Sequence, residues 1–132
     1  MEDFEARLRR LRRRDPRYPP IAYAFVLEAL EHTIRSTGRE GAKGEERHVS
    51  GRELLAGIRG YAAQEFGPLA RAVLDSWSIR RTEDFGEIVF NLVEEKLLSR
   101  REEDSKADFA GGFDFGEAFG TEPRLEGDEA AG

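Results

Sequence analysis

The chain has 132 residues, a formal net charge of −6 and no cysteine. This length favours one compact domain of roughly 100 residues with a tail, and the lack of cysteine excludes disulfides, thiolate metal ligands and cysteine nucleophiles. No apolar run approaches the roughly 18 residues of a membrane-spanning helix, and the first residues do not resemble a signal peptide, so we expect a cytoplasmic protein that does not bind a membrane.

The first predicted element is a short amphipathic helix over residues 3–14. Phe4, Leu8 and Leu11 recur at helical spacing, and Asp15-Pro16 stops the helix because proline cannot continue its hydrogen bonds. This region carries seven guanidinium groups that could contact a polyanion such as a nucleic acid: Arg7, Arg9, Arg10, Arg12, Arg13, Arg14 and Arg17. The alternative is a solvated helix face, since nearby carboxylates partly neutralise it and no aromatic residues stand between the arginines to stack on bases.

A second helix is predicted over residues 20–37. It begins with a proline, which suits the first helical turn, and a glycine follows its end. The glycine-rich, charged segment 38–47 is predicted to be an exposed loop. Ser50 and Glu53 then form a capping-box pattern, in which each side chain binds the other's backbone amide, so we expect a third helix from this point to Phe66.

Two more helices complete the predicted core of residues 20–98. A short helix follows Pro68, and a longer one spans residues 83–97 with Thr82 as its N-cap. The sequence therefore predicts a mainly α fold, a compact helical domain of about five helices around one hydrophobic core.

Helical periodicity is lost in the phenylalanine-rich arm, residues 99–119. Gly111-Gly112 and the alternating phenylalanines that follow predict a short β-hairpin or an extended arm. The rings of the arm either close the protein's own core or anchor it in a partner protein; they belong to Phe109, Phe113, Phe115 and Phe119. Residues 120–132 are acidic and have no apolar face to bury, so we expect a disordered tail after a single domain of residues 1–119.

The order of three helices and a hairpin resembles a winged helix-turn-helix. In that interpretation helix 83–97 would be the recognition helix and residues 99–116 the wing. This helix carries one lysine, Lys96, and five acidic residues, namely Glu83, Asp84, Glu87, Glu94 and Glu95. Such a face repels phosphate, so in this interpretation the usual DNA-docking surface has been lost or serves a protein partner.

Several longer segments resemble a family of small, uncharacterised bacterial proteins. These segments are RYPPIAYAFVLEAL, RHVSGRELLAGIRGYAAQEFGPLA, WSIRRTEDFGEIVFNLVE and DFAGGFDF, and the resemblance covers roughly residues 15–119. It implies a bacterial protein with one domain. It implies no activity, catalytic residue or ligand.

Residue patterns for metal binding and catalysis are missing from the sequence. His32 and His48 have no third ligand at metal-binding spacing, and Asp104, Asp108 and Asp114 lack the spacing of a calcium-binding loop. The sequence also has no nucleophile elbow and no phosphate-binding loop. We therefore expect no metal, no cofactor and no enzyme activity.

Arg47, His48, Arg80 and Arg81 flank predicted helix starts, where they could hold an anion or pair with the protein's own acids. With no catalytic pattern, the sequence favours a non-enzymatic bacterial protein-interaction or regulatory module. The alternative is a nucleic-acid-binding accessory protein that uses the arginine-rich helix.

Overall fold

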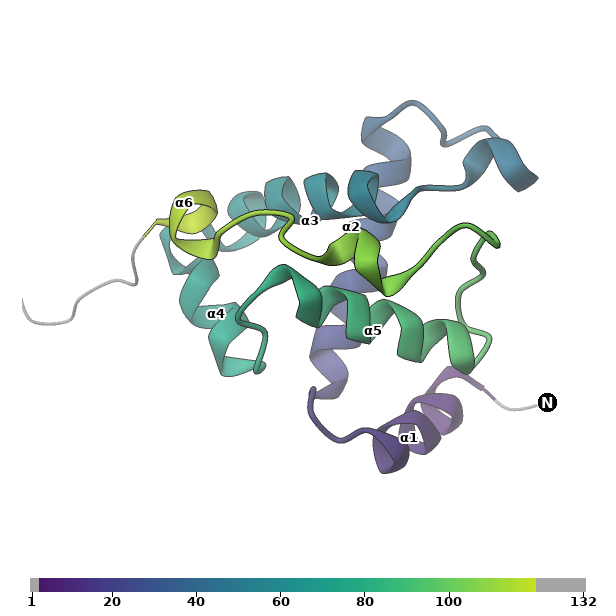
Figure 1. The fold of residues 1–132 in the computed structure, drawn as a ribbon, viewed down its shortest axis with the longest axis horizontal. Helices are drawn as coiled ribbons and strands as arrows, with labels where there is room; N and C mark the ends of the chain where they lie inside the picture. The colour runs from purple at the N-terminus through teal and green to yellow at the C-terminus, as the bar shows by residue number, and fades with distance from the viewer. Residues whose placement is uncertain (1–2, 121–132) are drawn as a thin grey trace, which may run out of the picture.

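A computed structural model describes residues 3–120, and its elements are helical (Figure 1). The α-helices are α1 (Phe4–Arg14), α2 (Pro20–Ser36), α3 (Gly51–Phe66), α4 (Ala70–Ser76), α5 (Thr82–Glu94) and α6 (Phe115–Phe119). Short 3₁₀ helices lie between them, namely η1 (Gly44–Arg47), η2 (Gly67–Leu69) and η3 (Lys106–Phe109). The prediction of a mainly helical fold is confirmed. Within residues 3–120 no helix is both long and apolar enough to cross a membrane.

Helix α2 lies at the centre of the fold because it is apolar over much of its surface. It packs against both α3 and α5, and Figure 1 shows these two helices crossing it. Its approach to α3 is closest at Gly57, where a Cβ atom would overlap Thr33 Oγ1. The buried core extends from Leu8 in α1 to Phe119 in α6, so all the α-helices contribute to one apolar cluster.

The capping box at the start of α3 is confirmed. The amide of Glu53 donates to Ser50 Oγ (3.1 Å), and the amide of Ser50 donates to Glu53 Oε1 (3.0 Å). The predicted N-cap of the next long helix is wrong, because Thr82 is already the first residue of α5. Instead, Asp84 Oδ2 accepts hydrogen bonds from the backbone amides just before the helix, including that of Arg80 (2.9 Å).

Helices α2, α4 and α5 end in the same way. In each, the residue after the C-cap has a left-handed backbone, with φ of 76° at Gly38, 67° at Ser78 and 63° at Lys96. At α4 the next amide, that of Ile79, donates back to the carbonyl of Leu74 (2.9 Å), which is the Schellman pattern. The corresponding left-handed turn at Lys96 ends α5 at residue 94, three residues earlier than predicted.

The predicted β-hairpin is wrong, since residues 99–119 form no strand and instead contain η3 and α6. The reason lies at the start of α5. The Thr82 hydroxyl donates to the carbonyl of Phe109 (2.6 Å) and accepts from the amide of Gly112 (3.0 Å), which leaves these groups unavailable to a partner strand. Without a wing, the winged helix-turn-helix has no support. The predicted tail lies, apart from Gly120, outside the described residues.

Candidate functional site

The phenylalanine-rich arm lies against the protein's own core. Phe109 is 2% exposed, Phe115 and Phe119 are also buried, and Phe113 is partly buried. The rings pack on one another, with the centroids of Phe113 and Phe115 5.7 Å apart. The four rings, which the sequence offers either as core residues or as anchors for a partner, therefore pack on the protein's own core. This packing leaves little ring surface for a partner.

Four of the seven arginines of the N-terminal run bind α5 or the two residues that follow it. Arg10 Nη2 lies 2.8 Å from Glu95 Oε1, and Arg14 Nη1 lies 2.7 Å from Glu95 Oε2. The carboxylate is almost fully covered, and hydrogen bonds from Arg14 and Arg10 lower the pKa of Glu95. Arg7 adds hydrogen bonds to the carbonyls of Glu95 and Lys96. The face of α1 that carries these arginines is therefore occupied within the molecule.

The linker between α1 and α2 continues this contact along α5. Arg17 Nη2 contacts Asp15 Oδ2 (2.7 Å) and Glu87 Oε1 (3.0 Å). Asn91 Nδ2 also donates to Asp15 (2.9 Å). The hydrogen bond from Arg17 lowers the pKa of the Asp15 carboxyl well below its usual range, although burial acts in the opposite direction.

These contacts complete a polar stripe on α5 that the N-terminal segment covers. Its members recur at helical spacing and are Asp84, Glu87, Asn91, Glu94 and Glu95. The acidic face that disfavours DNA is thus an internal docking site for arginines of the same chain. The spacing of the stripe is visible in the sequence, but its pairing with the arginine run is not.

Two exposed arginines of the run are also unpaired among the described residues. Arg9 and Arg13 make no hydrogen bond or ion pair with any residue between 3 and 120. Arg12 is turned the other way, and its Nε donates to the carbonyl of Tyr18 (2.8 Å). The candidate set for polyanion contact is therefore reduced to two freely available guanidinium groups.

Arg9 borders an apolar hollow that we call the α1–α2 groove. It has a volume of about 540 Å³, and its floor includes Phe4 and Leu8 from α1 and Ile21 and Ala24 from α2. Phe4 is 38% exposed and Ile21 is 55% exposed. Among the described residues Leu69 is the other large apolar side chain with comparable exposure (54%). The exposure of Ile21 is a feature that only the structure reveals.

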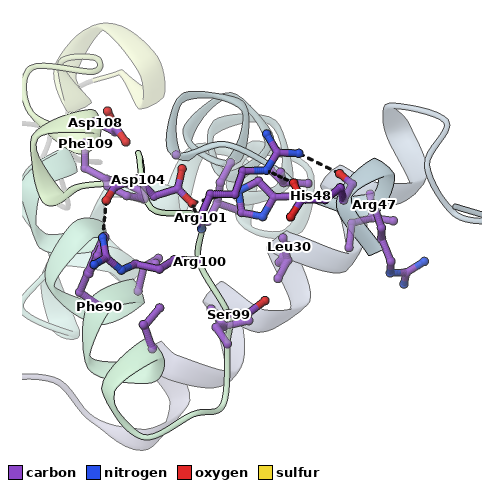
Figure 2. A pocket seen from close by; sticks show the side chains of 18 of the residues that line it. Leu30, Arg47, His48, Phe90, Ser99, Arg100, Arg101, Asp104, Asp108 and Phe109 are labelled. Carbon is purple, nitrogen blue, oxygen red and sulfur yellow. Dashed lines mark hydrogen bonds and ion pairs between the residues drawn. The ribbon is translucent and has the colours of Figure 1, made fainter. Parts of the chain in front are cut away.

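A second hollow, the α2–α5 cleft, lies between α2, α3, α5 and the segment that follows α5 (Figure 2). Its volume is about 510 Å³. The apolar wall includes Leu30, Ile34, Leu54, Val89, Phe90 and Val93. The apolar spacing of the helices does not predict a hollow between them.

Polar side chains close the rim of the α2–α5 cleft. His48 Nε2 lies 3.0 Å from Asp104 Oδ2, and these side chains are 15% and 14% exposed. Arg101 Nε lies 2.7 Å from Glu45 Oε1, so one ion pair and one histidine–carboxylate contact join the segments before α3 and after α5. Arg100 donates to the carbonyl of Asp104 (2.6 Å), and its guanidinium lies 5.7 Å from the centroid of the Phe90 ring.

The remaining candidate residues have structural partners. Arg80 pairs with Asp75 (2.7 Å), as the alternative of internal pairing predicts, and His32 packs against the ring of Tyr61 (centroids 5.1 Å apart). Asp108 accepts from the amide of Ser105 (3.0 Å). No group of three or more potential metal ligands occurs in the described part of the chain.

Comparison of the chain with protein-family models, with curated proteins and with solved structures finds no match.

Proposed function

We propose that this chain is a non-enzymatic bacterial protein-interaction or regulatory module that acts in the cytoplasm, and that it docks its partner in the α1–α2 groove. One observation carries the proposal. Phe4 and Ile21 are exposed next to each other in a hollow, and the unpaired Arg9 stands at its edge. An exposed apolar patch with a charged rim is typical of protein-binding surfaces.

The charges around the groove select the chemistry of the partner. Arg9 and Arg12 line the groove, and Glu5 is the one acid that lines it. Arg9 is exposed without a partner among the described residues, and Arg13, one helical turn further along α1, is likewise exposed and unpaired there. The groove is therefore cationic at its edge and apolar on its floor. This combination fits an amphipathic helix with apolar anchors on one face and carboxylates beside them.

The two parts of the surface contribute differently to binding. Full burial of an aliphatic side chain stabilises by roughly 1.5–3 kcal/mol, so covering the exposed half of Ile21 contributes about 1 kcal/mol. The arginines are solvated, so their pairing with carboxylates mainly accelerates the encounter and selects acidic partners. We therefore expect Ile21 to control the rate of dissociation and the arginines to control the dependence of association on salt.

The test uses a fluorescent synthetic helix with leucines on one face and glutamates on the other, and a matched helix with lysines in place of the glutamates. Fluorescence anisotropy with the full chain should show binding of the acidic helix and much weaker binding of the basic helix. Ile21→Asp should abolish binding, because it places a charge on the apolar floor. Leu69→Asp is the matched control, since Leu69 has the same exposure outside the groove.

Two results would contradict this docking surface. Equal binding of the acidic and basic helices would show that Arg9 and Arg13 do not select the partner. Equal loss of binding in Ile21→Asp and Leu69→Asp would show that the groove is not the contact surface. Because both side chains are exposed, we expect both variants to fold, and a circular dichroism spectrum of each variant checks this directly.

The alternative function, a nucleic-acid-binding accessory protein, is favoured only by the two unpaired arginines. The number of phosphates contacted sets the salt dependence, at about 0.9 decade of affinity per phosphate for each decade of salt. Contacts through Arg9 and Arg13 alone predict a slope of about −2, and a slope near −6 would require α1 to leave α5. A salt titration with a labelled DNA duplex, repeated with Arg9→Gln/Arg13→Gln, separates the two functions. Binding lost in this variant but retained in Ile21→Asp would support the alternative.

A further inference from the structure

The α2–α5 cleft has the size and the walls of a small-ligand site. Its volume of about 510 Å³ lies within the range of roughly 300–1,000 Å³ that is usual for such sites. Three helices supply its apolar wall, and Leu30, Val89, Phe90 and Val93 are each only partly buried there. These side chains have apolar surface left to cover, and they lie outside the α1–α2 groove.

The rim of the cleft offers one guanidinium that no acid neutralises. Within the described chain Arg101 pairs with Glu45, and Arg47 has Glu31 at 3.7 Å. Arg100 makes no ion pair in the same range, and its hydrogen bond goes to a backbone carbonyl. An anion in the cleft would therefore meet an available cation at Arg100 without breaking an existing ion pair.

The position of Arg100 connects the cation to the apolar wall. Its guanidinium lies over the ring of Phe90, and Figure 2 shows both residues on one side of the cleft, with Arg47 and His48 on the other. If the apolar group of a ligand packs beside Phe90, a substituent one or two bonds from that group would reach the guanidinium of Arg100. A planar carboxylate matches the paired N–H donors of arginine, and a single cation suits a monoanion better than a phosphate dianion.

We infer that the α2–α5 cleft binds a small organic carboxylate, with its apolar ring or branched chain against Phe90, Val89 and Val93 and its carboxylate on Arg100. The ion pair Arg101–Glu45 and the contact between His48 and Asp104 hold the two rim segments together and thereby keep the cleft in shape. This site shares no lining residue with the groove proposed for the partner protein, and it does not depend on that proposal.

The test uses phenylacetate as the probe, with phenylacetamide and 2-phenylethylamine as matched neutral and cationic controls. Each is titrated into the ¹⁵N-labelled full chain and followed by two-dimensional NMR. For a ligand of this size we expect a Kd of about 1 mM for the acid and at least tenfold weaker binding of the controls. The shifted amides should include those of residues 89–93 and 98–104, and those of residues 20–24 should stay in place.

A pair of variants tests the role of the cation. Arg100→Gln should weaken binding of the acid about tenfold, because it removes a charged hydrogen bond. Arg59→Gln, which also removes an exposed arginine that lies over a phenylalanine ring, that of Phe113, and makes no ion pair with the described residues, should leave binding unchanged. The inference is overturned if the amide binds as tightly as the acid, if Arg100→Gln has no effect, or if no shifts appear in the cleft at about 10 mM acid.

Discussion

The close approach of α2 and α3 gives a sharp prediction at Gly57. A Cβ atom at this position would overlap Thr33 Oγ1 and lie 2.9 Å from Thr33 Cβ. Carbon atoms in contact are normally about 3.5–4.0 Å apart, so Gly57→Ala must push the two helices apart by roughly 1 Å. Leu54 and Ile34 are close in sequence to this contact and line the α2–α5 cleft, so the substitution should also widen the cleft.

The magnitude follows from two opposing effects. Alanine is favoured over glycine by about 1 kcal/mol in a helix, and overpacking a core typically costs about 1–3 kcal/mol, or more when backbones must separate. The α2–α3 interface is extensive and Thr33 is 1% exposed, so the overlap has no free space into which to relax. We expect Gly57→Ala to lower the free energy of unfolding by about 3 kcal/mol.

The control is on the same helix. A Cβ atom at Gly60 would meet no atom within 4 Å, so Gly60→Ala should gain the helical preference of up to about 1 kcal/mol without a penalty. Urea denaturation followed by circular dichroism measures both variants. Thr33→Ala removes the overlapping hydroxyl and should restore part of the stability of Gly57→Ala. Equal stability of Gly57→Ala and Gly60→Ala would refute the reasoning.

Three other predictions concern the arm, a helix end and the N-terminal contact. Deleting the chain from Phe109 onward should lower the free energy of unfolding by about 5 kcal/mol, because three buried rings contribute roughly 1.5–3 kcal/mol each. If urea denaturation gives the truncated chain an unchanged stability, the arm does not close the core. Ser78→Gly should stabilise by about 1 kcal/mol, because glycine adopts a φ of 67° without strain, and a lower melting temperature would contradict this. The pKa values of Asp15 and Glu95 are lowered by folding, so their stabilising effect is complete above the unfolded-state values of about 4 and is lost as the pH falls through the folded-state values. The melting temperature should therefore decrease as the pH is lowered below about 4, and this decrease should be smaller in the Glu95→Gln variant.

Local signals in the sequence were sufficient for the helices and insufficient for the arm. The prolines, the capping box at Ser50 and the apolar spacing predict elements from interactions over a few residues, and these elements are confirmed. The alternation of Phe113 and Phe115 also looks local, but the arm is held by Thr82, 27 residues before Phe109. A long-range hydrogen bond of this kind leaves no periodic pattern, so the hairpin prediction failed.

The candidate sites show the same limit. The number of arginines in the N-terminal run, seven, predicts a surface that binds polyanions. Their number does not show which of them already have a carboxylate nearby. The answer depends on α1 lying along α5, which places Arg10 and Arg14 on Glu95 and leaves Arg9 and Arg13 exposed. Exposure of Ile21 and the position of Arg100 over Phe90 are likewise consequences of packing between distant segments.

Helix α2 contributes to both proposed sites, and its length keeps them apart. Ile21 lies in the α1–α2 groove near its start, and Ile34 lines the α2–α5 cleft near its end. At a rise of about 1.5 Å per residue these positions are roughly 20 Å apart, so a helix in the groove and a small acid in the cleft would not collide. Any effect of one ligand on the other must therefore pass through the packing of α2 against α3 and α5. Gly57→Ala disturbs that packing without touching either site's charged group, so it should weaken binding of the acid while leaving Arg9 and Arg13 in place.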